Sequence, residues 1–109
     1  SASIKANVDF YFDSFPISHW LKQQDVVYDD GSYADKGEMH LEAARRLGVP
    51  FSECLVIEDS VTAIALAKRN GAGRIVGVGE TADGSELLAL GADHYIHDFT
   101  EFDYAWLEN

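Results

Sequence analysis

The sequence predicts an α/β fold: a Rossmann-like parallel sheet with helices on both faces. Along its 109 residues, stretches with helical apolar spacing alternate with short apolar runs, which is typical of such folds. The clearest run, Cys54-Leu55-Val56-Ile57, is followed at once by Glu58, Asp59 and Ser60. Four consecutive apolar residues indicate a strand buried on both faces, and Ser60 is suited to cap a following helix. Because open α/β folds bind ligands at the carboxyl ends of their strands, we expect a ligand site at Glu58 and Asp59.

The first half of the chain predicts two helices and one short strand. Apolar side chains at helical spacing predict a helix over residues 4–15. Residues 26–28 predict a strand, closed by the turn sequence Asp29-Asp30-Gly31. A second helix is expected over residues 38–47, and Gly48 is suited to end it in a left-handed conformation.

The second half continues the alternation and supplies most of the expected sheet. Its expected elements are a strand over 54–58 with Cys54 in its core, a helix over 61–70, a strand over 74–79, a short helix near 87–90 and a strand at 95–96. The sequence Gly77-Val78-Gly79-Glu80-Thr81-Ala82 also matches a dinucleotide-binding pattern. Its glycines alternate with valine inside the expected strand, and too little chain follows for a complete mononucleotide-binding half, so we do not expect a dinucleotide site here.

Composition narrows the classes of partner. The chain has 19 acidic side chains against 8 Lys and Arg, a net charge of −11, and no Lys or Arg after Arg74. Nucleic acids and anionic membranes bind basic surfaces, so neither is expected as a partner. Cys54 is the single cysteine, which excludes an internal disulfide, and no apolar run approaches the roughly 18 residues of a membrane span. We therefore expect a cytoplasmic protein.

Glu58 and Asp59 are suited to a divalent cation. Two carboxylate charges about 4 Å apart repel by roughly 4 kcal/mol at an effective dielectric constant near 20. A hard cation converts this repulsion into binding, and Mg²⁺ prefers such oxygen ligands. The alternative is an exposed acidic pair at the end of a strand.

Three short motifs occur in a fixed order along the chain. Ser1-Ala2-Ser3 precedes the first helix, Lys36-Gly37 precedes the second, and the strand at 54–58 ends in Glu58-Asp59-Ser60. In this combination the chain resembles the haloacid dehalogenase (HAD) superfamily, and within it the β-phosphoglucomutase and phosphoglycolate-phosphatase-like branch. The stretches that carry the resemblance are 41–49, 54–61, 67–72, 76–79 and 91–96.

The resemblance implies an Mg²⁺-dependent phosphatase or phosphomutase acting on a small phosphorylated metabolite. It implies that Ser1 binds a phosphoryl oxygen and that Lys36 is the catalytic lysine, which neutralises charge near the nucleophile. It further implies that Glu58 and Asp59 hold Mg²⁺. Phosphoryl transfer depends mainly on positioning and charge neutralisation, and these residue types suit both tasks.

The chain departs from the branch at two motifs. In members of this branch the lysine occurs in the motif Lys-Pro-x-Pro-Asp. An ungapped alignment places Ala34 at the position of the lysine and Glu38 at the position of the aspartate. Lys36 fits instead the Lys-Gly form of other branches, or its match to the branch requires a two-residue deletion. The Asp-x-Asp nucleophile motif is absent from the 109 residues. We therefore expect residues 1–109 to be the C-terminal part of a HAD-like core domain truncated at its N-terminus, inactive alone, without the cap and the nucleophile-bearing segment.

The expected truncation also predicts which partners the chain has. In the family's strand order, the strand at 54–58 would lie beside a strand that this chain lacks, which would leave an open apolar edge prone to association. We expect self-association or pairing with the missing N-terminal half.

Two other functions stay open from the sequence. A receiver-like signalling domain would accept a phosphoryl group on Asp59 and use Asp29 and Asp30 as its acidic pair, although it would need a lysine after its last strand. A catalytically dead relative that serves as a binding module would have the same sequence features.

Overall fold

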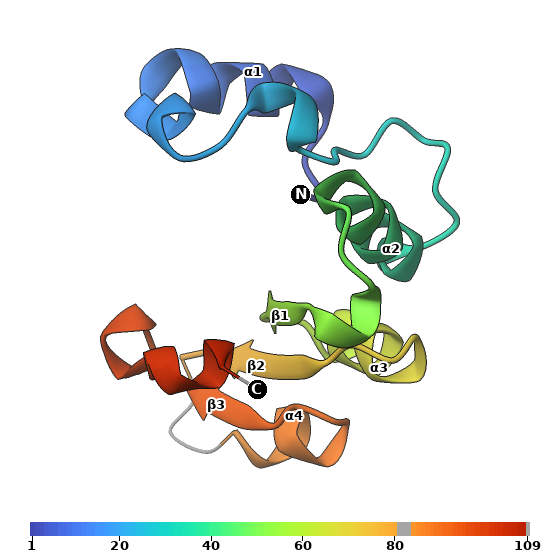
Figure 1. The fold of residues 1–109 in the computed structure, drawn as a ribbon, viewed down its shortest axis with the longest axis vertical. Helices are drawn as coiled ribbons and strands as arrows, with labels where there is room; N and C mark the ends of the chain where they lie inside the picture. The colour runs from blue at the N-terminus through green and yellow to red at the C-terminus, as the bar shows by residue number, and fades with distance from the viewer. Residues whose placement is uncertain (81–83, 109) are drawn as a thin grey trace. The chain divides into compact units, whose positions relative to one another are not determined.

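The computed structural model describes residues 1–80 and 84–108 and divides into two compact units, Ser1–Val49 and Pro50–Asn109 (Figure 1). The N-terminal unit contains helices α1 (Lys5–Ser14) and α2 (Lys36–Leu47) and the 3₁₀ turns Pro16–His19 and Gln23–Asp25. The C-terminal unit contains strands β1 (Leu55–Glu58), β2 (Arg74–Val78) and β3 (His94–Ile96), helices α3 (Val61–Arg69) and α4 (Ser85–Ala89), and the 3₁₀ turns Phe51–Glu53, Phe99–Glu101 and Tyr104–Leu107.

Helix α1 confirms the helix expected over residues 4–15. Val8 is the buried residue of this helix. The helix ends at Ser14, two residues before Pro16, whose ring disfavours helical backbone in the residue ahead of it.

Helix α2 begins two residues earlier than expected. Asp35 is its N-cap, because the Glu38 amide donates to Asp35 Oδ1 (3.0 Å), and the Ala34 amide donates in turn to Glu38 Oε2 (2.6 Å). These two bonds form a variant of the capping box, in which Glu38 accepts from the amide one residue ahead of the N-cap. Lys36, expected just before the helix, is therefore its first residue. The helix ends as expected at Gly48, which is left-handed (φ 71°).

The strand expected at residues 26–28 is wrong. This segment is not assigned as a strand, and two main-chain hydrogen bonds join it to the start of the chain. The Ser1 nitrogen donates to the Val27 carbonyl (2.7 Å), and the Asp29 amide donates to the Ser3 carbonyl (2.9 Å). Because higher residue numbers pair with higher ones, the two segments run in the same direction. Two bonds are too few for a strand ladder, so the apolar run stays irregular.

The sheet of the C-terminal unit confirms the predicted fold class. Its strands are all parallel, in the order β1-β2-β3. Parallel strands need a crossover connection, and α3 and α4 supply the two crossovers (Figure 1). The expected boundaries of both helices and of β2 and β3 agree with the structure to within one or two residues.

Different elements cover the two faces of the sheet. One face packs against α3 and α4 around a core of Val56, Ile64, Ala67, Ile75, Leu87 and Ala92. Arg74 and His94 lie on the opposite face, because alternate residues of a strand point to opposite sides and His94 pairs with Val76. Both residues contact Trp106 of the C-terminal 3₁₀ turn. Helical structure therefore covers both faces of β2 and β3.

Strand β1 differs from the sequence expectation in two ways. It is the edge strand of the described sheet, and although Val56 is buried, Ile57 is 39% exposed. Cys54 precedes the strand, is half-buried, and its thiol donates to the Pro50 carbonyl (3.5 Å). Partial burial raises the pKa of this thiol. The expectations of a strand buried on both faces and of Cys54 in its core are therefore wrong.

Gly77 lies where α4 packs closely on β2. A Cβ atom on Gly77 would lie 3.1 Å from Leu87 Cδ1, so the glycine permits close packing of α4 on β2. The last two positions of the dinucleotide pattern, Thr81 and Ala82, lie outside the described residues. Over the described part of the chain, no helix combines the length and the apolar character that crossing a membrane requires.

We predict that Glu42 stabilises the N-terminal unit in a pH-dependent way. Arg45 Nη2 (2.5 Å) and Arg46 Nε (3.0 Å) donate to Glu42 Oε1, and these bonds lower its pKa from 4.5 to about 2. A carboxylate with a depressed folded-state pKa contributes its full stability above its unfolded-state pKa. The contribution is lost as the pH falls from 4.5 towards about 2.

Thermal unfolding followed by circular dichroism tests this prediction. The melting temperature of Glu42→Gln should lie below that of the unsubstituted chain at neutral pH, and the difference should disappear near pH 2. Glu86→Gln, at an exposed position of α4, is the control. A difference that does not change with pH would contradict the prediction.

Candidate functional site

The candidate site begins where β1 passes into α3. Glu58 is the last residue of β1 and is half-buried, whereas Asp59 follows it and is exposed. Ser60 is the N-cap of α3, because its Oγ accepts a hydrogen bond from the Ala63 amide (3.1 Å). The apolar run ends at the edge of the sheet and the serine starts the helix at once, so two carboxylates occupy a short strand-to-helix turn.

The charges at this turn act in opposite directions on a cation. The first turn of α3 has no acidic residue, and its basic residues, Lys68 and Arg69, are in its last turn. The partial positive charge of the helix N-terminus opposes a cation, so the attraction here comes from the two carboxylates alone.

The donor set fits Mg²⁺. Among residues 1–80 and 84–108, no three His, Cys, Asp or Glu side chains are grouped as metal ligands. Mg²⁺ commonly takes only one or two carboxylates from the protein and completes its octahedron with water and substrate phosphate. Glu58 and Asp59 supply two such oxygen donors on adjacent residues.

Ser1 and Lys36 belong to the N-terminal unit. The Ser1 hydroxyl oxygen accepts from the Ser3 amide (3.1 Å), and the Ser1 nitrogen is bonded to Val27, so the exposed serine is tied to its own unit. Lys36 is half-buried at the first position of α2. The structure thus places Glu58 and Asp59 together in one unit, and Ser1 and Lys36 in the other.

Sequence analysis missed the residues that orient Lys36. The capping box of Asp35 and Glu38 sets the start of α2 and therefore the position of the lysine. The signal was present in the sequence, since Asp-x-x-Glu before an apolar-periodic stretch is a capping pattern.

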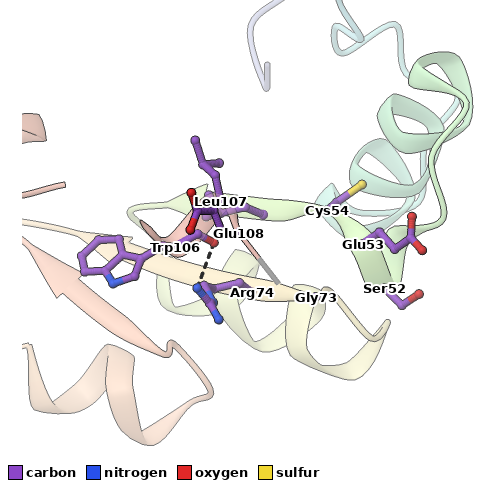
Figure 2. Close-up of a pocket in the computed structure, with 9 residues that line it drawn as sticks. Ser52, Glu53, Cys54, Gly73, Arg74, Trp106, Leu107 and Glu108 are labelled. Atoms are coloured by element: carbon purple, nitrogen blue, oxygen red, sulfur yellow. Dashed lines mark hydrogen bonds between the residues drawn. The ribbon is translucent and has the colours of Figure 1, made fainter. Parts of the chain in front are cut away.

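Sequence analysis also missed a small cavity at the opposite edge of the sheet. This cavity, of about 110 Å³, lies at the amino ends of β1 and β2. Figure 2 shows the residues that line it. Its walls include Cys54, Leu55, Gly73, Arg74, Trp106 and Leu107. Gly73 is required there, because a Cβ atom would lie 2.3 Å from the Ser52 carbonyl oxygen. No motif could predict this cavity, since three distant segments form it.

Comparison with known proteins supports the HAD superfamily. No protein-family model matches the sequence, and no curated protein matches it. Among solved structures, the chain is similar to a HAD hydrolase, family IA, variant 3, from Entamoeba histolytica. The identity is 27% and the TM-score 0.86, over 97% of this chain and 48% of that one. It is also similar to a hydrolase from Pseudomonas syringae (32% identity, TM-score 0.58), over 72% of this chain and 39% of that one.

These likenesses define a class rather than a particular protein. They support a HAD-like fold for this chain, and the printed names of both similar proteins describe hydrolases. The chain spans about half, or less, of the length of the two proteins it matches.

We predict that the Ser60 cap holds the turn that carries the two carboxylates. Ser60→Ala removes the acceptor for the Ala63 amide and should lower the free energy of unfolding by about 1 kcal/mol. Ser60→Thr, which keeps a hydroxyl, is the matched control. Urea unfolding measures the loss, and amide hydrogen exchange at Ala63 should accelerate only in the alanine variant. Equal stabilities of the two variants would contradict the prediction.

Proposed function

We propose that this chain is the C-terminal part of an Mg²⁺-dependent phosphoryl-transfer enzyme, a phosphatase or phosphomutase that acts on a small phosphorylated metabolite. We place it in the β-phosphoglucomutase and phosphoglycolate-phosphatase-like branch of the HAD superfamily. The main support is the likeness to a HAD hydrolase over 97% of the chain, combined with Glu58 and Asp59 at the carboxyl end of β1.

Each proposed site residue has a distinct task. Glu58 and Asp59 hold Mg²⁺, which when bound neutralises charge on the phosphoryl oxygens. The Ser1 hydroxyl donates a hydrogen bond to a phosphoryl oxygen. The Lys36 ammonium group offsets the negative charge that gathers around the nucleophile. Together these groups supply positioning and charge neutralisation, on which phosphoryl transfer depends.

The nucleophile is proposed to come from outside these 109 residues. Covalent catalysis requires a nucleophile, and the Asp-x-Asp motif is absent from the sequence. The cap that would select the substrate is proposed to lie outside as well. In support, the similar hydrolase from Entamoeba histolytica has about as much chain again. The chain alone is therefore proposed to be inactive.

The edge of β1 is the proposed surface for the missing part. β1 pairs with β2 on one side only, and Ile57 is partly exposed on it. An exposed edge strand presents unpaired backbone groups to another strand. The missing N-terminal half, or a second copy of the chain, is the proposed partner there. A cytoplasmic location stays a prediction from the single cysteine.

Mg²⁺ titration tests the metal assignment. In the unsubstituted chain, Mg²⁺ should shift the amide NMR signals of residues 58–61. Asp59→Asn should weaken this binding about tenfold or more, since it removes one of two charged ligands. Glu86→Gln, an exposed acidic residue elsewhere in the unit, is the matched control and should bind normally. Unchanged binding in Asp59→Asn would overturn the metal site.

A phosphatase assay tests the proposed missing nucleophile. The purified chain should hydrolyse a generic aryl phosphate no faster than buffer with Mg²⁺. Hydrolysis that disappears in Asp59→Asn would show that a nucleophile lies within these residues. That result would overturn the proposed truncation while supporting the phosphatase activity itself.

A further inference from the structure

The C-terminal 3₁₀ turn Tyr104–Leu107, called the strap below, is attached to the sheet through Trp106. Arg74 Nη1 on β2 donates to the Trp106 carbonyl oxygen (2.9 Å), as Figure 2 shows. The indole ring stacks on the imidazole of His94 on β3, with ring centroids 4.1 Å apart and an interplanar angle of 7°. Two strands therefore hold the strap, one through its backbone and one through a side chain.

The remaining side chains of the strap contribute little to its attachment. Tyr104 is 79% exposed and Leu107 is 61% exposed. Phe102, just ahead of the strap, meets the Trp106 ring edge-on with centroids 5.2 Å apart. The attachment therefore depends on Trp106.

The strap lies on the sheet face that carries Val76 and Ile96. The strand register places both residues on the same face as Arg74 and His94, and they are 0% and 1% exposed. Loss of the strap would uncover apolar strand surface on this face.

The strength of the stack depends on the charge of His94. A neutral imidazole gives an aromatic contact, whereas an imidazolium over an indole face adds a cation–π attraction. Histidine side chains exchange these forms within the physiological range of pH. A contact between an imidazole and an indole is therefore stronger when the imidazole carries a proton, so pH can change its strength.

Charged groups surround this contact on every neighbouring element. Arg74 is the cation on β2. The anions are Asp93 before β3, Glu101 in the turn after it, Asp103 at the N-cap of the strap and Glu108 after the strap. Two other titratable groups, His97 and Tyr104, lie on the same segments, and His97 Nδ1 is paired with Glu101 Oε1 (2.9 Å).

We propose that the strap is a pH-sensitive latch, in which proton uptake by His94 tightens the hold of Trp106 on β2 and β3 and proton loss loosens it. The proton comes from solvent and forms an N–H bond on the His94 imidazole, and on proton loss it returns to solvent; no other covalent bond changes. The latch is independent of the proposed phosphoryl-transfer site, since it uses other residues.

Acrylamide quenching of tryptophan fluorescence tests the latch. Trp20→Phe, which replaces an indole that is 79% exposed, leaves Trp106 as the single reporter. The lifetime-corrected quenching constant should be roughly twofold or more larger near pH 8 than near pH 5.5, as expected for loss of a cation–π contact. In the Trp20→Phe background, His94→Gln should bring this ratio to one, whereas His97→Gln should leave it unchanged.

Two outcomes would overturn the proposal: equal quenching at both pH values in Trp20→Phe, or a ratio that survives in the His94→Gln variant. Hydrogen exchange of the Trp106 amide in the unsubstituted chain keeps the test valid if a variant fails to fold. This amide donates to the Asp103 carbonyl within the turn (3.0 Å). Its protection factor, corrected for the intrinsic effect of pH, should be severalfold larger near pH 5.5, and equal factors would also overturn the latch.

Discussion

The parallel pairing of β1 with β2 is the constraint on which the C-terminal unit depends. Parallel strands cannot be joined by a tight turn, so the chain must cross over through α3, which buries Ile64 and Ala67 against the sheet. The same direction brings the carboxyl ends of the strands to one edge and their amino ends to the other. Glu58 and Asp59 therefore lie at the edge typical of ligand sites, whereas the cavity beside Arg74 lies at the opposite edge.

Different kinds of interaction stabilise the two units. The C-terminal unit has a contiguous apolar core between its helices and the sheet. In the N-terminal unit, the described polar interactions are mainly local: the capping box at Asp35 and Glu38, and the charged cluster of Glu42 with two arginines. Exposed clusters of this kind respond to pH and salt, whereas burial of Ile64 does not. The proposed site residues are divided between these two kinds of structure.

Much of the fold could be predicted because its signals are local. The serine cap, the left-handed Gly48 and the valine-rich run of β2 each occur within a few consecutive residues. The predictions that were wrong depended on neighbours distant in sequence. Residues 26–28 have the composition of a strand but lack a full ladder beside them, and Ile57 has the composition of a core residue but lies on an edge strand. The composition of a segment indicates which secondary structure it can adopt. Whether it pairs as a strand depends on the segments that lie beside it in the fold.

The sequence by itself determined the α/β class, the order of the elements in the C-terminal unit, and the position of the two carboxylates at the end of a strand. These follow from periodicity and capping, which act over one or two turns of chain. The tertiary structure alone decided that β1 is an edge strand, that Gly73 touches the Ser52 carbonyl, and that Trp106 meets Arg74 and His94. Those contacts join segments up to 32 residues apart, and no local pattern specifies which distant surfaces will meet.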